Sequence, residues 1–75
     1  MKKTPPVNNK FFQLGQKIQR TRKAKGMTQE MLAEEIGVSQ NYITYVETAK
    51  SKPSLKILIK IADALQVKVK DLIPF

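Results

Sequence analysis

The sequence predicts a compact, all-α domain of five short helices. Apolar residues recur at steps of three and four along most of the chain, which is the spacing of one helix face. Threonine and serine residues that suit the N-cap position stand directly before two of these apolar stretches. Glycines and prolines separate the stretches and leave only short connections. A length of 75 residues fits a single domain.

The chain is expected to begin with an arm ahead of the folded domain. Residues 1–9 contain two prolines and two asparagines, which disfavour a helix, and they are predicted to form a flexible basic arm. Residues 10–75 are predicted to form the domain. Its first helix starts at the first of these residues, places Leu14 and Ile18 on the buried face, and ends at Gly26.

The second and third helices are expected to form a tightly connected pair. Thr28 and Ser39 are predicted N-caps, and each has an apolar residue directly before it and another four positions later. Gly37 is expected to adopt a left-handed conformation and to end the second helix. The connection is then only about three or four residues long, which forces the two helices to cross compactly.

The last third of the chain predicts two more helices. The fourth begins at Pro53 and Ser54 and is broken at residues 66–68; the fifth is short, spans 69–73 and stops at Pro74. The helical periodicity of all five segments predicts one apolar core. Its expected members are Leu14, Ile18, Leu32, Ala33, Ile36, Val38, Ile43, Val46, Leu55, Leu58, Ile61, Ala62, Leu65 and Leu72.

The charge of the chain is strongly basic. Fourteen Lys and Arg residues face six Asp and Glu residues, for a net charge of +8. Residues 1–26 hold many of the cations and no acid, and a second basic set follows at Lys50, Lys52, Lys56 and Lys60. This distribution favours a polyanionic partner, nucleic acid before a membrane surface. The alternative is a solvated basic surface that serves only solubility.

The composition argues against an enzyme and against a cofactor. The chain has no Cys and no His, which excludes disulfides, thiol chemistry and the usual zinc sites. It has no glycine-rich phosphate loop, and the adjacent Glu34 and Glu35 diverge on a helix, so they cannot act as a catalytic pair. No small-molecule ligand is evident either.

A cytoplasmic location is expected. No apolar run reaches the roughly 18 residues that a membrane-spanning helix needs. The N-terminus begins with two lysines but has no apolar stretch after them, so it does not have the pattern of a secretory signal.

The third helix has the composition of a helix that reads DNA. On a helical wheel of residues 40–47, Ile43 and Val46 point toward the core. Amide, hydroxyl and phenol groups can form directional pairs with base edges, whereas phosphate binding needs positive charge. The opposite arc of the wheel carries such groups, on Gln40, Asn41, Thr44 and Tyr45. The alternative is that this arc is an ordinary polar surface.

Five segments of the chain together have a familiar pattern. They are Met27–Ala33, Gly37–Gln40, Val46–Glu47, Lys50–Leu55 and Ile61–Val67. The chain resembles the Cro/cI-type (Xre-like) helix-turn-helix transcriptional regulators over residues 12–73. The resemblance implies a five-helix, lambda-repressor-like fold. It implies a sequence-specific regulator of double-stranded DNA that reads the major groove with helix 39–47. Repression by blocking the polymerase is the simplest mechanism, and activation is equally permitted.

The resemblance also implies roles for single residues. It implies a buried ion pair between Arg22 and Glu47, and a Gln29 that contacts a phosphate and braces Gln40. It places base readout on Gln40, Asn41, Thr44 and Tyr45. It places phosphate contacts on Gln29, Lys50, Ser51 and Lys52, and Tyr42 is a further candidate for such a contact.

Three positions depart from the pattern of the family. Ala49 stands where a glycine is usual, so the loop after the third helix is expected to turn differently. Tyr42 replaces a smaller residue and is expected either to contact the DNA backbone or to pack inward. Lys68 replaces a Ser or Thr cap, so the fifth helix is expected to fray.

The resemblance implies a homodimer on a near-palindromic DNA site. Ile57, Ile59 and the C-terminal segment to Phe75 are the candidate contact surface, and the alternative is a monomer with scattered exposed apolar residues. The alternative to the regulator is an adaptor: a helix-turn-helix protein-interaction module, such as an antitoxin half.

Overall fold

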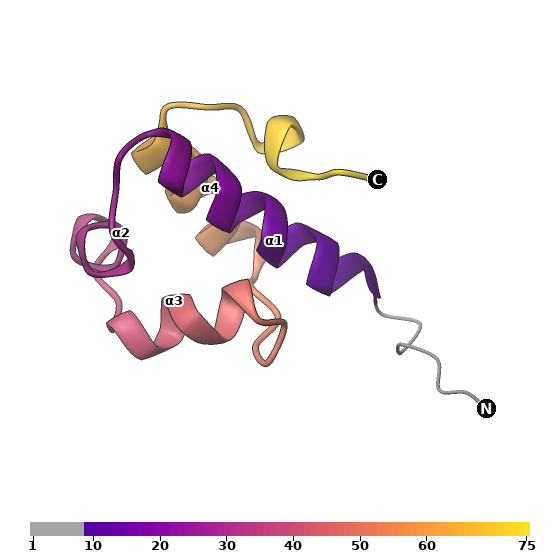
Figure 1. Cartoon of the computed structure of the whole chain (residues 1–75), viewed down its shortest axis with the longest axis horizontal. Helices are drawn as coiled ribbons and strands as arrows, with labels where there is room; N and C mark the ends of the chain where they lie inside the picture. Colours follow the sequence, from indigo (N-terminus) through magenta and orange to yellow (C-terminus); the bar gives the residue numbers. More distant parts are fainter. Residues whose placement is uncertain (1–8) are drawn as a thin grey trace.

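The computed structural model describes residues 9–75 as four α-helices and one 3₁₀-helix. They are α1 (Asn9–Ala24), α2 (Gln29–Ile36), α3 (Gln40–Glu47), α4 (Leu55–Leu65) and η1 (Val69–Leu72). Figure 1 shows α2 and α3 on one side of α1 and the C-terminal segment with η1 on the other. The all-α prediction is confirmed. The predicted arm lies outside the described residues, apart from Asn9, where α1 begins.

The predicted helix starts are present as capped N-termini. The hydroxyls of Thr28, Ser39 and Ser54 each accept a hydrogen bond from the backbone N–H three residues later, at 3.0, 3.1 and 3.2 Å. Gly37 has φ = 77° and ends α2 in the left-handed conformation that was expected. The short link from α2 to α3 therefore follows from residues whose own conformational preferences match it.

The fifth helix is a single 3₁₀ turn and not an α-helix. Lys68 makes no side-chain cap, as its chemistry predicts, but its backbone N–H donates to the carboxylate of Asp71 at 3.0 Å. This bond satisfies one of the free donors at the start of the turn. The turn is further held because Leu72 is fully buried.

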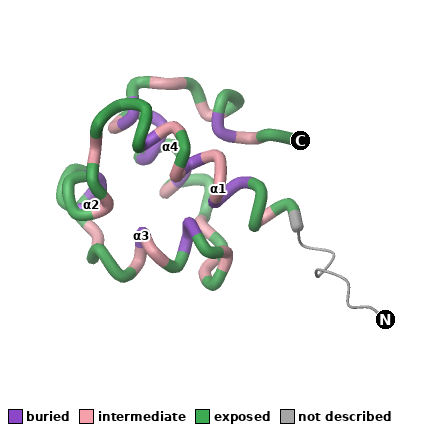
Figure 2. The backbone as a smooth tube through the Cα atoms, in the orientation of Figure 1, coloured by how far each residue is buried: buried purple, intermediate pink, exposed green. Residues whose placement is uncertain are grey.

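The core lies where α1, α2, α3 and α4 face one another, and Leu72 of η1 belongs to it. Figure 2 shows the buried positions along the chain. Twelve of the fourteen predicted core residues are buried. Leu55 is 66% exposed, and Val38 is half-buried at the edge of the core. Periodicity gives the buried face of a helix but not the point along it where its neighbours end. Leu55, the first residue of α4, projects into solvent for this reason.

Within residues 9–75, no helix is long and apolar enough to cross a bilayer.

Candidate nucleic-acid interface

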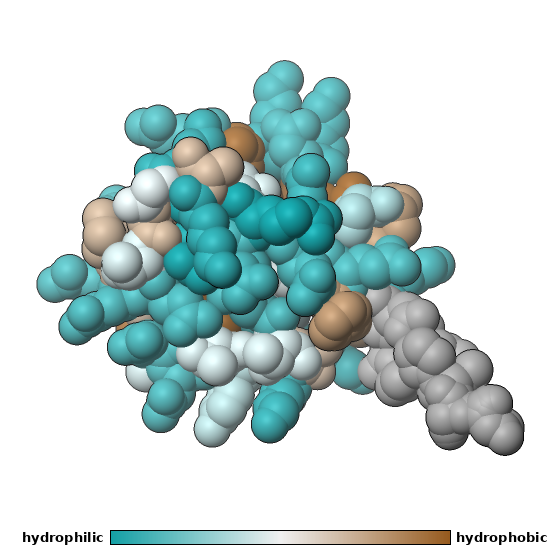
Figure 3. All heavy atoms as spheres, viewed as in Figure 1, coloured by the Kyte–Doolittle hydropathy of each residue, from teal (hydrophilic) through white to brown (hydrophobic). Residues whose placement is uncertain are grey.

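α3 presents the uncharged polar face that the sequence predicts. Ile43 and Val46 are buried, whereas Gln40 and Asn41 are exposed and Tyr45 is 47% exposed. Thr44 is half-buried beside them. The side of the molecule where α3 lies, at the bottom of Figure 3, shows mainly pale and teal side chains. The outer face of α3 is therefore open to a partner and not covered by the rest of the described chain.

Gly15 allows α1 to approach the C-terminal end of α3. A Cβ atom at this position would lie 2.5 Å from the carbonyl oxygen of Val46 and 2.7 Å from that of Glu47. Both distances are too short for any side chain, so only glycine fits here without a backbone shift. Gly15 was not among the residues predicted from the sequence. The available signal was an isolated glycine inside a strongly helical pattern. Glycine lowers the stability of a helix, so its presence there points to a packing reason, such as a close approach of another helix.

A buried ion pair connects α1 with the end of α3. Arg22 Nε donates to Glu47 Oε2 at 2.7 Å, and Arg22 Nη2 donates to Glu47 Oε1 at 3.2 Å. The two side chains are only 6% and 0% exposed. Arg22 Nη1 also donates to the backbone carbonyl of Met27, at 2.7 Å, ahead of α2. This is the pair that the resemblance implied, and it makes Arg22 a structural cation that is not available to DNA.

Gln29, the first residue of α2, joins this ion pair to the exposed face of α3. Its Nε2 donates to Glu47 Oε1 at 2.9 Å, and its Oε1 accepts from the hydroxyl of Thr44 at 3.0 Å. The resemblance implied that Gln29 braces Gln40, and this expectation is corrected. The charged carboxylate of Glu47 is the stronger acceptor, so it holds the amide of Gln29 farther along α3.

The loop after α3 keeps a left-handed residue although it has no glycine. Ala49 has φ = 64°, so the expectation of a different turn at this position is wrong. The backbone N–H groups of Lys50 and Ser51 both donate to the carbonyl of Tyr45, at 2.8 and 3.1 Å. These bonds hold Ala49 in a conformation that costs an L-residue roughly 1–2 kcal/mol.

The cations of this loop flank α3. Lys50 and Lys52 are exposed, and Ser51 is half-buried between them. The ammonium of Lys52 lies 5.3 Å from the centre of the Phe11 ring, which holds this side of the loop against α1. Tyr42 is half-buried and packs against the core, which agrees with one of the two options predicted for it, and its contact with the DNA backbone stays a prediction.

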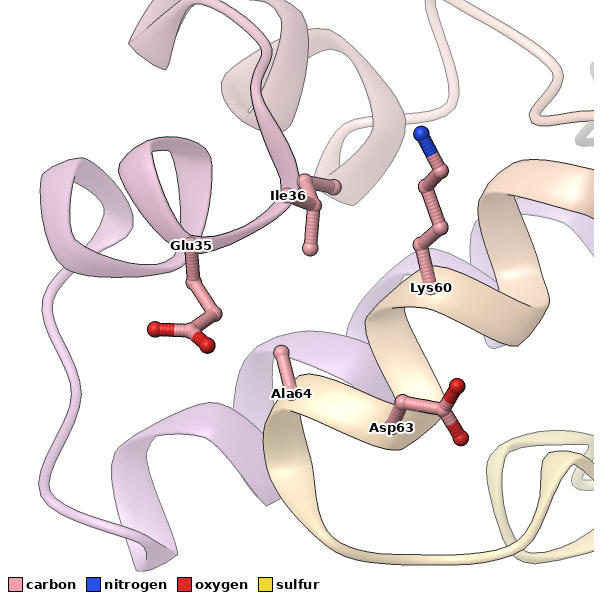
Figure 4. A pocket seen from close by; sticks show the side chains of 5 residues that line it. All are labelled: Glu35, Ile36, Lys60, Asp63 and Ala64. Atoms are coloured by element: carbon pink, nitrogen blue, oxygen red, sulfur yellow. The ribbon is translucent and has the colours of Figure 1, made fainter.

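A separate hollow of about 270 Å³ lies between the end of α2 and α4 (Figure 4). Glu35 and Ile36 line it from α2, and Lys60, Asp63 and Ala64 line it from α4. Figure 4 shows the carboxylate of Glu35 and the ammonium of Lys60 pointing in different directions. Two carboxylates make this hollow unfavourable for a polyanion, and α3 takes no part in it.

Comparison with known proteins assigns the fold to a family. Residues 18–72 match the model of a family described as helix-turn-helix. The chain belongs to the Cro/cI-type (Xre-like) helix-turn-helix transcriptional regulators. An uncharacterised HTH-type transcriptional regulator of Archaeoglobus fulgidus is 39% identical over 59 residues, which are 79% of this chain and 84% of that protein.

Two solved structures of the family are similar to this chain. The controller protein C.AhdI of a restriction-modification system from Aeromonas hydrophila gives a TM-score of 0.80 at 34% identity, over 83% of this chain and 94% of that one. SinR, the master regulator of biofilm formation of Bacillus subtilis, was solved in complex with DNA. It gives a TM-score of 0.73 at 37% identity, over 79% of this chain and 95% of that one. The protein is thus a DNA-binding transcription regulator of the helix-turn-helix type and not an enzyme.

Proposed function

We propose that the protein is a transcriptional repressor that lays α3 in the major groove of double-stranded DNA. The observation that carries this proposal is the open, uncharged polar face of α3, next to the exposed cations of the following loop. Charge-neutral donors and acceptors suit base edges, and flanking cations suit phosphates. A repressor of this kind would act where the chromosome lies, in the cytoplasm.

The reading face supplies four candidate base contacts. The amides of Gln40 and Asn41 can pair with adenine through its N6 and N7 atoms. Thr44 offers a hydroxyl and a methyl group, and the exposed ring of Tyr45 can contact a thymine methyl or a phosphate. Gln40, Asn41 and Tyr45 are exposed on consecutive turns of one helix around the half-buried Thr44, which supports a single base-reading surface.

The phosphate contacts surround this face. Lys50 and Lys52 offer charge, Ser51 offers a hydroxyl, and the half-buried Tyr42 carries a phenol. Gln29 can reach a phosphate with its second amide N–H, at the N-terminus of α2 where free backbone N–H groups also attract anions. We assign these contacts to positioning the protein on the duplex.

We further propose that the repressor binds as a homodimer. Ile59 is 44% exposed, Phe75 is 57% exposed, and Ile57 is half-buried beside the core. A two-fold dimer through these apolar residues would present two α3 helices to half-sites about 34 Å apart. The molecular mass of the protein in dilute solution and the spacing of selected half-sites test this part of the proposal.

The decisive experiment is selection of preferred sites from random DNA, followed by binding measurements at several salt concentrations. We expect one preferred motif with two related halves, and a steep loss of affinity as salt rises. Replacing Lys50 with Ala is expected to weaken all sequences alike and to reduce the salt slope by about one. If no sequence is preferred and binding is absent even at low salt, the adaptor alternative replaces the repressor.

A further inference from the structure

Among the four residues of the reading face, Gln40, Asn41, Thr44 and Tyr45, it is Thr44 whose side chain is connected to the buried ion pair. Its hydroxyl bonds to the side chain of Gln29, which in turn bonds to Glu47. The connection runs from Arg22 to Glu47, from Glu47 to Gln29, and from Gln29 to Thr44, with contacts of 2.7, 2.9 and 3.0 Å. Each contact in this chain is a hydrogen bond with a defined donor and acceptor. The direction of the first bond therefore determines the direction of those that follow.

The direction is set by charge. Both oxygens of the Glu47 carboxylate accept hydrogen bonds from the Arg22 guanidinium, which can only donate, so this carboxylate acts as an acceptor. The Gln29 atom that faces this carboxylate must then be the amide nitrogen, because an amide oxygen there would be repelled. The carbonyl oxygen of Gln29 consequently faces Thr44, and the Thr44 hydroxyl must donate to it.

The second protein partner of the hydroxyl acts in the same direction. Thr44 Oγ1 lies 3.3 Å from the backbone carbonyl oxygen of Gln40, which is also an acceptor. A threonine hydroxyl has one proton and two lone pairs. Both neighbours, the carbonyl oxygens of Gln29 and Gln40, are acceptors, so the hydroxyl proton of Thr44 points toward them. The lone pairs of the hydroxyl, and not its proton, therefore face the outer side of α3.

We propose that Gln29 is a positioning residue that presents Thr44 to DNA as a hydrogen-bond acceptor. This inference rests on the proposed function, with α3 in the major groove. Adenine and cytosine expose an amino group there, at N6 and N4, whereas guanine and thymine expose only acceptor oxygens and N7 at the corresponding positions. Thr44 therefore selects an amino-bearing base on the strand it contacts and rejects a keto base.

The first test compares the sites selected by three proteins. Thr44→Val keeps the shape and a methyl group but removes the hydroxyl, and Thr21→Val on α1 is the matched control. We expect the native protein and the control to select adenine or cytosine at one position where Thr44→Val loses the preference. If the native protein selects guanine or thymine at the position that Thr44→Val alters, the inference is overturned. This includes a thymine that is read through its methyl group. A native protein that selects no site overturns the proposed function itself.

The second test removes the amino group from the DNA. The base at the Thr44 position is replaced by the same base without its exocyclic amino group, and the affinities of the native protein and Thr44→Val are measured on both duplexes. We expect the native protein to lose about tenfold in affinity, the value of one well-made hydrogen bond. The affinity of Thr44→Val is expected to change by less than about twofold, because this variant has no hydroxyl to accept from the amino group. Comparing the two losses in a double-mutant cycle cancels the effect of the altered base pairing. Equal losses for both proteins overturn the inference.

The third test separates positioning by Gln29 from a phosphate contact. Gln29→Met removes the hydrogen-bond chain at similar length, and the exposed Gln13→Met is the control. We expect Gln29→Met to reduce the preference for an amino base at the Thr44 position while preferences at the other positions remain. Loss of affinity for all sequences alike, with the Thr44 preference intact, overturns the positioning role. Circular dichroism checks that both variants are folded. If Gln29→Met does not fold, the second test still decides the inference, because it does not use this variant.

Discussion

The two ends of α3 are held in different ways. At its start, Gly37 takes the left-handed conformation and the Ser39 hydroxyl caps the helix, so each residue is suited to its place. At its end, Ala49 takes a left-handed conformation that alanine disfavours. Local backbone bonds to the carbonyl of Tyr45 hold Ala49, and the end of α3 also has tertiary contacts: the bond between Arg22 and Glu47, and the close approach of α1. Local chemistry thus suffices at the start of the reading helix, whereas its end also depends on packing against α1.

Removing the buried carboxylate should break the end of α3 most strongly. Glu47→Ala leaves the charge of Arg22 buried without a partner, and we expect a loss of about 3–5 kcal/mol in the free energy of unfolding. Urea denaturation followed by circular dichroism measures it, and a variant already unfolded without urea meets the expectation. Glu34→Ala on the exposed face of α2 is the control and should change stability by less than about 0.5 kcal/mol. A loss below 1 kcal/mol for Glu47→Ala would contradict a tertiary anchor, by the same scale.

Adding one methyl group at Gly15 should have the next largest effect. Helix propensity alone predicts that Gly15→Ala gains roughly 0.5–1 kcal/mol inside α1. Because the new Cβ would meet the carbonyl oxygens of Val46 and Glu47, we expect a loss of about 1–3 kcal/mol instead. The sign of the change in urea midpoint therefore decides between propensity and packing, and a stabilised variant would show that α1 and α3 can separate at no cost.

The two left-handed positions that flank α3, Gly37 and Ala49, sharpen the comparison and are expected to give the smallest effects. Ala49→Gly relieves a backbone that alanine disfavours and should stabilise the protein by about 0.5–1 kcal/mol. Gly37→Ala introduces the same conflict at the other end and should destabilise by about 1 kcal/mol. Thermal unfolding of both variants measures the two shifts. Shifts of the same sign would mean that the ends of α3 do not differ in the way described.

Much of the fold could be predicted because its signals are local. The caps at Thr28 and Ser39 and the turn at Gly37 follow from conformational preferences of single residues. The core face follows from helical spacing. The errors occur where neighbours decide: Leu55 belongs to the right face but lies beyond the packed part of α4, and the fifth helix shortens to one 3₁₀ turn.

The sequence by itself determined which residues lie on the outer face of α3, because helical geometry separates them from the buried ones. The tertiary structure alone decided what those residues can offer to a partner. Gly15 permits the close packing of α1 on α3, and Glu47 orients Gln29 and, through it, the hydroxyl of Thr44. Both effects depend on atoms far apart in sequence, and the direction of a hydrogen bond depends on the charge that lies buried behind it.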